Sequence, residues 1–191
     1  MSDSIQPVSF RNFATDFAGF SQELGTSFAT YGFAVISDHG LDQARIDAAI
    51  AAAKAFFALP EETKKAYVVG TGSQRGYTPF GIETAKGATH HDLKEFWHMG
   101  RDLAPGHRYE GIMPPNVWPS EVPAFHADVA WLFNALDAMG VKVLEAIASY
   151  LNLDRGFFAP TVQDGNSILR LLHYPPAPFD GPNIRAGAHE D

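Results

Sequence analysis

Three His-x-Asp triplets in the sequence could each supply two side chains to one metal ion. They are His90-His91-Asp92, His126-Ala127-Asp128 and His189-Glu190-Asp191. Non-haem Fe(II) oxygenases hold iron with two histidines and one carboxylate on one face of the metal, and the opposite face stays open. On an extended segment residues i and i+2 point the same way, so both ligands of a triplet can reach one ion. Each triplet is therefore a candidate for two ligands of an iron site.

The secondary structure predicted around each triplet distinguishes the three candidates. Apolar residues at helical spacing place His126 and Asp128 on a long helix, where residues i and i+2 lie roughly 200° apart and do not face each other. His90 and Asp92 end a stretch, residues 70–92, that contains five glycines and little periodicity, and it is predicted to be a hydrated loop. The last triplet follows a predicted strand and a turn-rich loop. Spacing alone leaves its metal role open.

The rest of the chain is predicted to mix helices and strands. Apolar periodicity and turn residues predict strands near 5–10, 31–36, 93–99 and 167–174, and helices over 13–28, 41–57, 123–151 and directly after Pro60. Six apolar residues of the long helix are expected to be buried, namely Phe125, Val129, Leu132, Leu136, Val143 and Ile147.

Composition excludes several classes of protein. The chain has 191 residues, of which 46% are hydrophobic, which suits one domain or most of one. The net charge of -8 offers no basic face for nucleic acid. The absence of cysteine excludes disulfides and thiolate metal sites. It also fits a cytoplasmic protein, which we expect. We see neither a signal peptide nor an apolar run of the ~18 residues needed to span a membrane.

Six segments, in order along the whole chain, resemble one enzyme family. They are Tyr-Gly-Phe-Ala-Val-Ile-Ser-Asp-His-Gly (31–40), Phe-Phe-Ala-Leu-Pro-Glu-Glu-Thr-Lys (56–64), Arg-Gly-Tyr (75–77), Lys-Glu-Phe-Trp (94–97), Asn-Val-Trp-Pro (116–119) and Leu-Leu-His-Tyr-Pro-Pro (171–176). Together they resemble the isopenicillin N synthase-like Fe(II)- and 2-oxoglutarate-dependent dioxygenases.

The resemblance implies an α+β fold with a double-stranded β-helix, or jelly-roll, core flanked by helices and incomplete in this chain. Residues 1–191 would form a single, truncated oxygenase domain. Its parts would be an N-terminal helix and strand region (1–120), a long buttressing helix (121–160) and the first jelly-roll strands up to the iron motif (165–191).

The resemblance also implies roles for single residues. His189 and Asp191 match two iron ligands, and Tyr174 matches a tyrosine that binds the 2-oxoglutarate carboxylate in some members. The family strand commonly reads Asn-Tyr-Tyr-Pro, whereas this chain has Leu172 and His173 before Tyr174. Because His173 alternates away from Tyr174, we expect it to be a structural polar residue. Arg170 could line the pocket or cap a sheet edge.

The implied function is oxidation of a small organic molecule by dioxygen, with Fe(II) as cofactor, 2-oxoglutarate as co-substrate, and succinate and carbon dioxide as co-products. Two alternatives stay open: an iron oxidase of the same fold that does not use 2-oxoglutarate, and a non-catalytic binding module with a broken iron site. We expect neither nucleic acid nor a membrane as partner.

The family's second histidine and its Arg-x-Ser clamp for 2-oxoglutarate have no counterpart before Asp191. We therefore expect the natural protein to continue for roughly another hundred residues. We also expect residues 1–191 alone to lack activity, because they supply only two of three iron ligands.

Overall fold

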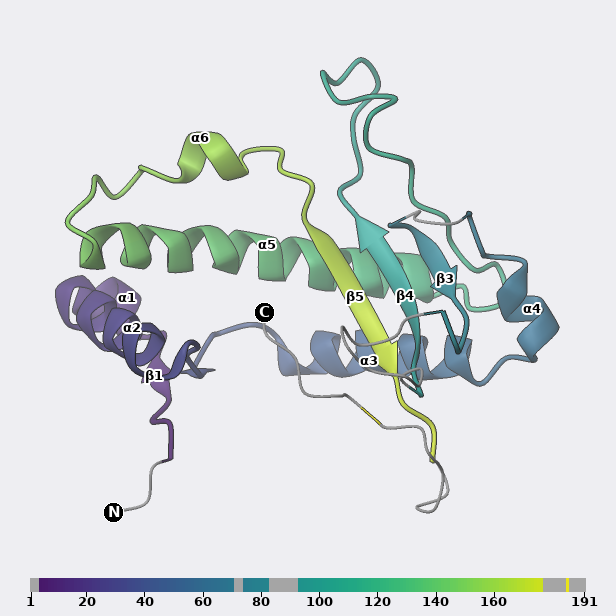
Figure 1. The fold of residues 1–191 in the computed structure, drawn as a ribbon, viewed down its shortest axis with the longest axis horizontal. Helices are drawn as coiled ribbons and strands as arrows, with labels where there is room; N and C mark the ends of the chain where they lie inside the picture. The colour runs from purple at the N-terminus through teal and green to yellow at the C-terminus, as the bar shows by residue number, and fades with distance from the viewer. Residues whose placement is uncertain (1–3, 71–73, 83–92, 177–184, 186–191) are drawn as a thin grey trace. The chain divides into compact units, whose positions relative to one another are not determined.

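The computed structural model describes residues 4–70, 74–82, 93–176 and 185. These residues form a mixture of helices and strands (Figure 1), which confirms the predicted mixed composition. The order of the elements is β1 (Val8–Ser9), α1 (Asn12–Thr15), α2 (Phe17–Tyr31), β2 (Ile36–Ser37), α3 (Gln43–Phe57), α4 (Glu61–Lys65), β3 (Gly76–Thr78), β4 (Glu95–Gly100), α5 (Phe125–Tyr150), α6 (Ala159–Val162) and β5 (Ile168–His173). None of the helices in these ranges is long and apolar enough to cross a membrane.

The chain divides into two compact units. The first comprises Met1–Ile46 and Asn134–Gly165, and the second comprises Asp47–Phe133 and Asn166–Asp191. The long helix α5 contributes its N-terminal part to the second unit and the remainder to the first.

In the first unit, β1 and β2 pair in parallel, and Val8 lies in a core with Phe20 and Leu24 of α2. The predicted strand over 31–36 is wrong for most of its length, because α2 continues to Tyr31 and only Ile36–Ser37 is a strand. The helix ends at Gly32, whose φ of 81° is a left-handed conformation that glycine adopts without steric cost. A strongly β-forming stretch is thus overridden by the glycine that caps the helix.

In the second unit, β3, β4 and β5 form an antiparallel sheet in that order (Figure 1). Side chains alternate between the two faces of each strand. One face, the core face, carries Tyr77, Trp97, Met99, Leu169 and Leu171, which pack against α3 and the first part of α5. The other face, which we call the open face, carries Phe96 and His98, which are buried, and Arg170 and Leu172, which are exposed.

The burial predicted for six apolar residues of the long helix α5 is confirmed for most of them. Phe125, Val129 and Leu132 are buried, and Val143 and Ile147 are half-buried against the first unit's core. The prediction for Leu136 is wrong, because 37% of it is exposed. This residue follows the stretch of α5 that packs in the second unit and precedes the stretch that packs in the first.

We expect Phe125→Ala to destabilise the full-length protein by about 3–5 kcal/mol, because Phe125 is fully buried among Phe56, Trp97 and Trp118. Leu136→Ala is the control on the same helix and should cost far less. Denaturant unfolding followed by tryptophan fluorescence measures both losses. Similar losses from the two variants would contradict the burial pattern.

Candidate functional site

The predicted site residues lie at and beyond the end of β5. Tyr174 follows the last residue of that strand and is half-buried. Its backbone oxygen accepts a hydrogen bond of 2.9 Å from Nη2 of Arg185, whose guanidinium lies 5.8 Å from the centre of the Tyr174 ring. His189 and Asp191 lie outside the described residues, so their assignment as metal ligands stays a prediction.

The second triplet lies on helix α5, as predicted. His126 and Asp128 both lie near the start of α5, and His126 is exposed and stacks on Trp118 at 4.1 Å between ring centres. Asp128 lies in the first turn of the helix, where a negative charge complements the helix dipole. His90 and Asp92 lie outside the described residues. Within the part of the chain that is described, no three His, Asp or Glu side chains form a group that could hold a metal.

The open face combines apolar side chains with the cation of Arg170. Arg170 of β5 and His98 of β4 are directly opposite each other, and Arg170 Nε donates a hydrogen bond of 2.7 Å to His98 Nε2. The guanidinium also lies 4.3 Å from the centre of the Phe96 ring. Arg170 therefore lies across this face of the sheet.

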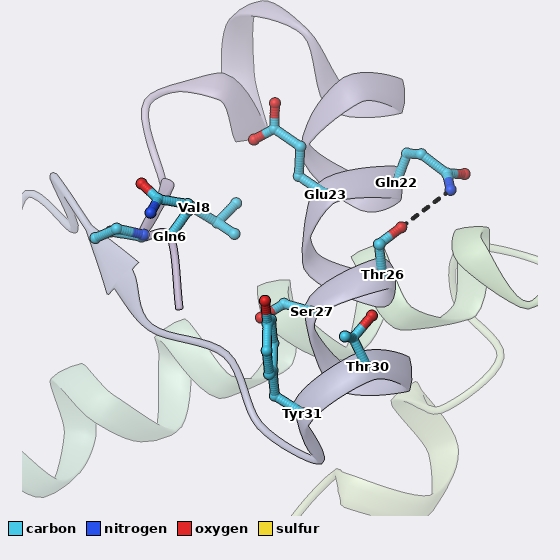
Figure 2. A pocket seen from close by; sticks show the side chains of 9 residues that line it. Gln6, Val8, Gln22, Glu23, Thr26, Ser27, Thr30 and Tyr31 are labelled. Carbon is cyan, nitrogen blue, oxygen red and sulfur yellow. Dashed lines mark hydrogen bonds between the residues drawn. The ribbon is translucent and has the colours of Figure 1, made fainter. Parts of the chain in front are cut away.

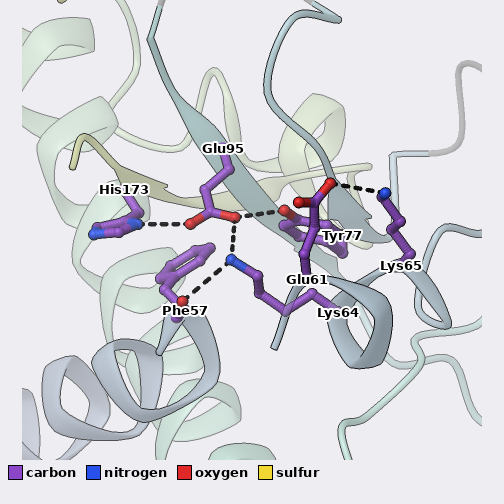
Figure 3. Close-up of polar contacts among 7 residues, drawn as sticks. All are labelled: Phe57, Glu61, Lys64, Lys65, Tyr77, Glu95 and His173. Carbon is purple, nitrogen blue, oxygen red and sulfur yellow. Dashed lines mark hydrogen bonds and ion pairs between the residues drawn. The ribbon is translucent and has the colours of Figure 1, made fainter. Parts of the chain in front are cut away.

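The core face carries a buried polar network at the end of β5, where His173 lies (Figure 3). Glu95 of β4 is only 1% exposed. Its Oε2 accepts bonds from Lys64 Nζ, at 2.7 Å, and from the Tyr77 hydroxyl, while its Oε1 lies 2.7 Å from His173 Nδ1. Lys64 Nζ also donates to the backbone oxygen of Phe57 at 3.2 Å. The network confirms the structural role expected for His173.

The grouping of Lys64, Tyr77 and Glu95 was missed at the sequence level. The available signal was that each lies in one of the family-like segments. A buried ion pair is costly unless its hydrogen bonds are satisfied, and here both carboxylate oxygens have partners.

Two features raise the pKa of Tyr77 well above its ordinary value. The larger effect is burial of the phenol, and the next is its hydrogen bond to the Glu95 carboxylate. The folded pKa lies above the unfolded one, so this phenol adds stability below pH about 10 and loses that contribution as the pH rises further. We expect tyrosinate absorbance to show a late-titrating phenol that disappears in Tyr77→Phe. The same late phase in both proteins would contradict this environment.

The first unit contains a separate cavity of about 360 Å³ between β1 and α2 (Figure 2). Its lining includes Gln6, Gln22, Glu23, Thr26 and Tyr31, and Gln22 Nε2 donates to Thr26 Oγ1 at 3.2 Å. Among the described residues that line it, Glu23 is the one ionisable group besides the Tyr31 phenol, and none is a histidine. These residues do not form a metal-binding or acid–base arrangement.

Residues 6–121 match a family model described as the N-terminal region of non-haem dioxygenases in morphine synthesis. Among related proteins, the 2-oxoglutarate-dependent dioxygenase caaD of Aspergillus niger is 32% identical over 165 residues, which is 84% of this chain and 51% of that protein. The proline hydroxylase buaE of Petromyces alliaceus is 31% identical over 183 residues, 90% of this chain and 55% of that protein. The chain thus spans about half the length of these curated relatives.

Two solved structures are similar to this chain as well. A protein of the 2OG-Fe(II) oxygenase family from Caulobacter crescentus is 69% identical, with a TM-score of 0.89 over 97% of this chain and 60% of that one. A full-length protein from Neurospora crassa, solved in complex with alpha-KG, is 27% identical, with a TM-score of 0.82 over 98% of this chain and 61% of that one.

Proposed function

Because the chain belongs to the family of non-haem dioxygenase N-terminal regions, we propose that it is part of an Fe(II)- and 2-oxoglutarate-dependent oxygenase that oxidises a small organic molecule. The match over residues 6–121 carries the proposal. Its further support is the position of Tyr174, which follows β5 directly and precedes the segment that carries the last His-x-Asp triplet.

The side chains proposed as ligands are of types that bind Fe(II). Imidazole and carboxylate are ligands that Fe(II) accepts, and the chain has no thiolate to compete for it. His189 and Asp191 would supply two ligands, and the third would come from outside these residues. When bound, the iron supplies the oxidising chemistry with dioxygen: 2-oxoglutarate, dioxygen and a substrate C–H bond give succinate, carbon dioxide and a C–OH bond.

The protein's own groups would bind and orient the reactants. The Tyr174 hydroxyl would donate a hydrogen bond to a 2-oxoglutarate carboxylate. Apolar side chains of the open face, among them Phe96 and Leu172, would keep water away. Arg170 shares that face and would give it a fixed positive charge. In this proposal β3, β4 and β5 belong to a jelly roll, residues 1–191 are part of one oxygenase domain, and the protein acts in the cytoplasm.

The substrate class is a small molecule in this proposal. A second structure of the Neurospora crassa protein, 27% identical with a TM-score of 0.74, is a complex with alpha-KG and thymine. The related buaE is named a proline hydroxylase. Thymine and L-proline are therefore suitable first probes.

The test supplies the full-length protein with Fe(II), dioxygen and 2-oxoglutarate labelled at C1, and measures carbon dioxide and succinate. We expect equal amounts of both, and none after the iron is chelated. An oxidase that does not use 2-oxoglutarate would consume dioxygen without releasing succinate. A binding module would bind no iron at all.

A further inference from the structure

Tyr174 lies one residue beyond the end of the β4–β5 ladder, and its backbone oxygen accepts a hydrogen bond from Arg185. The β4–β5 ladder ends at the pair Glu95 and His173, one residue before Tyr174. The next two residues are Pro175 and Pro176, which have no N–H to donate. The ladder therefore stops just short of the residue whose side chain is proposed to meet 2-oxoglutarate.

His173 is held firmly at this last ladder position. Its Nδ1 lies 2.7 Å from Glu95 Oε1, and its ring stacks on Phe57 with 5.1 Å between ring centres and 20° between planes. Glu95 cannot turn away readily, because Lys64 and Tyr77 both bond its other oxygen. Lys64 is in turn tied to the end of α3 by its bond to Phe57. Figure 3 shows these groups converging on the Glu95 carboxylate.

We propose that Glu95, acting through His173, is a positioning residue that fixes Tyr174 for binding of the 2-oxoglutarate carboxylate. This inference rests on the proposed function. Side chains alternate along an extended chain, so the Tyr174 phenol is expected on the open face, opposite the side chain of His173. The contacts of His173 with Glu95 and Phe57 on the core face would then hold the backbone next to Tyr174. Supporting groups of this kind typically contribute about 10–100-fold to the function of the groups they hold.

The test is an anaerobic calorimetric titration of the Fe(II)-loaded, full-length protein with 2-oxoglutarate, so that the readout does not depend on turnover. The variant His173→Phe keeps an aromatic ring against Phe57 and removes the bond to Glu95, while Glu95 keeps its bonds to Lys64 and Tyr77. Glu95→Gln removes the charge from the centre of the network. We expect each variant to weaken 2-oxoglutarate binding about tenfold while leaving Fe(II) binding unchanged.

Two controls separate positioning from a general loss of structure. Glu62→Gln makes the same change on an exposed face of α4 and should leave 2-oxoglutarate affinity unchanged. The double variant Glu95→Gln/His173→Phe should lose no more affinity for 2-oxoglutarate than the stronger single variant, because both changes disrupt the same contact between Glu95 and His173. If Glu95→Gln does not fold, His173→Phe decides the result alone.

A dissociation constant for 2-oxoglutarate that is the same in His173→Phe as in the wild-type protein overturns this inference and leaves the proposed function intact. Equal weakening of Fe(II) and 2-oxoglutarate binding also overturns it, since the contact between Glu95 and His173 would then support the iron ligands as much as Tyr174. Failure of the wild-type protein to bind 2-oxoglutarate refutes the proposed function and this inference with it.

Discussion

Replacing His189 by alanine is expected to abolish iron-dependent turnover of the full-length protein, whereas replacing His126 by alanine should leave it nearly intact. His189 is proposed to bind the metal directly, so its loss should cost more than the roughly 100-fold that losing a supporting group costs. His126 is exposed on α5, and its described ring contact is with Trp118. The rate of oxygen-dependent 2-oxoglutarate consumption at saturating Fe(II) measures both effects.

The comparison is matched, because both histidines begin a His-x-Asp triplet. Equal losses from the two variants would contradict the assignment of the last triplet as the iron pair. A normal rate after loss of His189 would contradict it as well. Thermal melting of each variant without metal shows whether a loss of rate reflects a loss of fold.

Replacing Lys64 by methionine is expected to destabilise the protein by about 3–5 kcal/mol, because it leaves the buried Glu95 carboxylate without its cation. Denaturant unfolding followed by tryptophan fluorescence is a suitable measurement, since the buried Trp97 lies in β4, the strand that carries Glu95. Lys65→Met is the matched control one residue later. Lys65 pairs with Glu61 and Glu62 at the surface, and exposed ion pairs contribute little to stability.

A double variant shows whether charge or packing causes the loss. Lys64→Met/Glu95→Gln removes both charges of the pair, so it should be less destabilised than Lys64→Met alone. A double variant that is as unstable as the sum of both single changes would mean that packing, and not the uncompensated charge, dominates.

Much of the secondary structure was predictable, because it depends on local signals. Pro60 marks the start of α4 and two acidic residues follow it, as predicted. The apolar spacing of α5 predicted its length closely, from 123–151 expected to Phe125–Tyr150 observed. The errors have local physical causes too: Gly32 caps α2 within a β-rich stretch, and Leu136 lies between two packed stretches of one helix.

The polar network was not predictable, because strand pairing assembles it from distant segments. Glu95 is 31 residues from Lys64 and 78 residues from His173. Alternation along the strand predicted that His173 and Tyr174 face opposite ways, and from it we expected a structural role for His173. It could not show that the register of β4 and β5 places Glu95 directly opposite His173. The same limit applies to Arg170 and His98, which are 72 residues apart.

The last His-x-Asp triplet, His189-Glu190-Asp191, is proposed to hold iron. The most direct test is anomalous scattering at the iron absorption edge from crystals of the full-length protein grown anaerobically with Fe(II). We predict one iron peak per chain, at coordination distance from the side chains of both His189 and Asp191. An iron peak at His90 and Asp92, or an iron-loaded protein whose metal contacts neither His189 nor Asp191, would contradict the account.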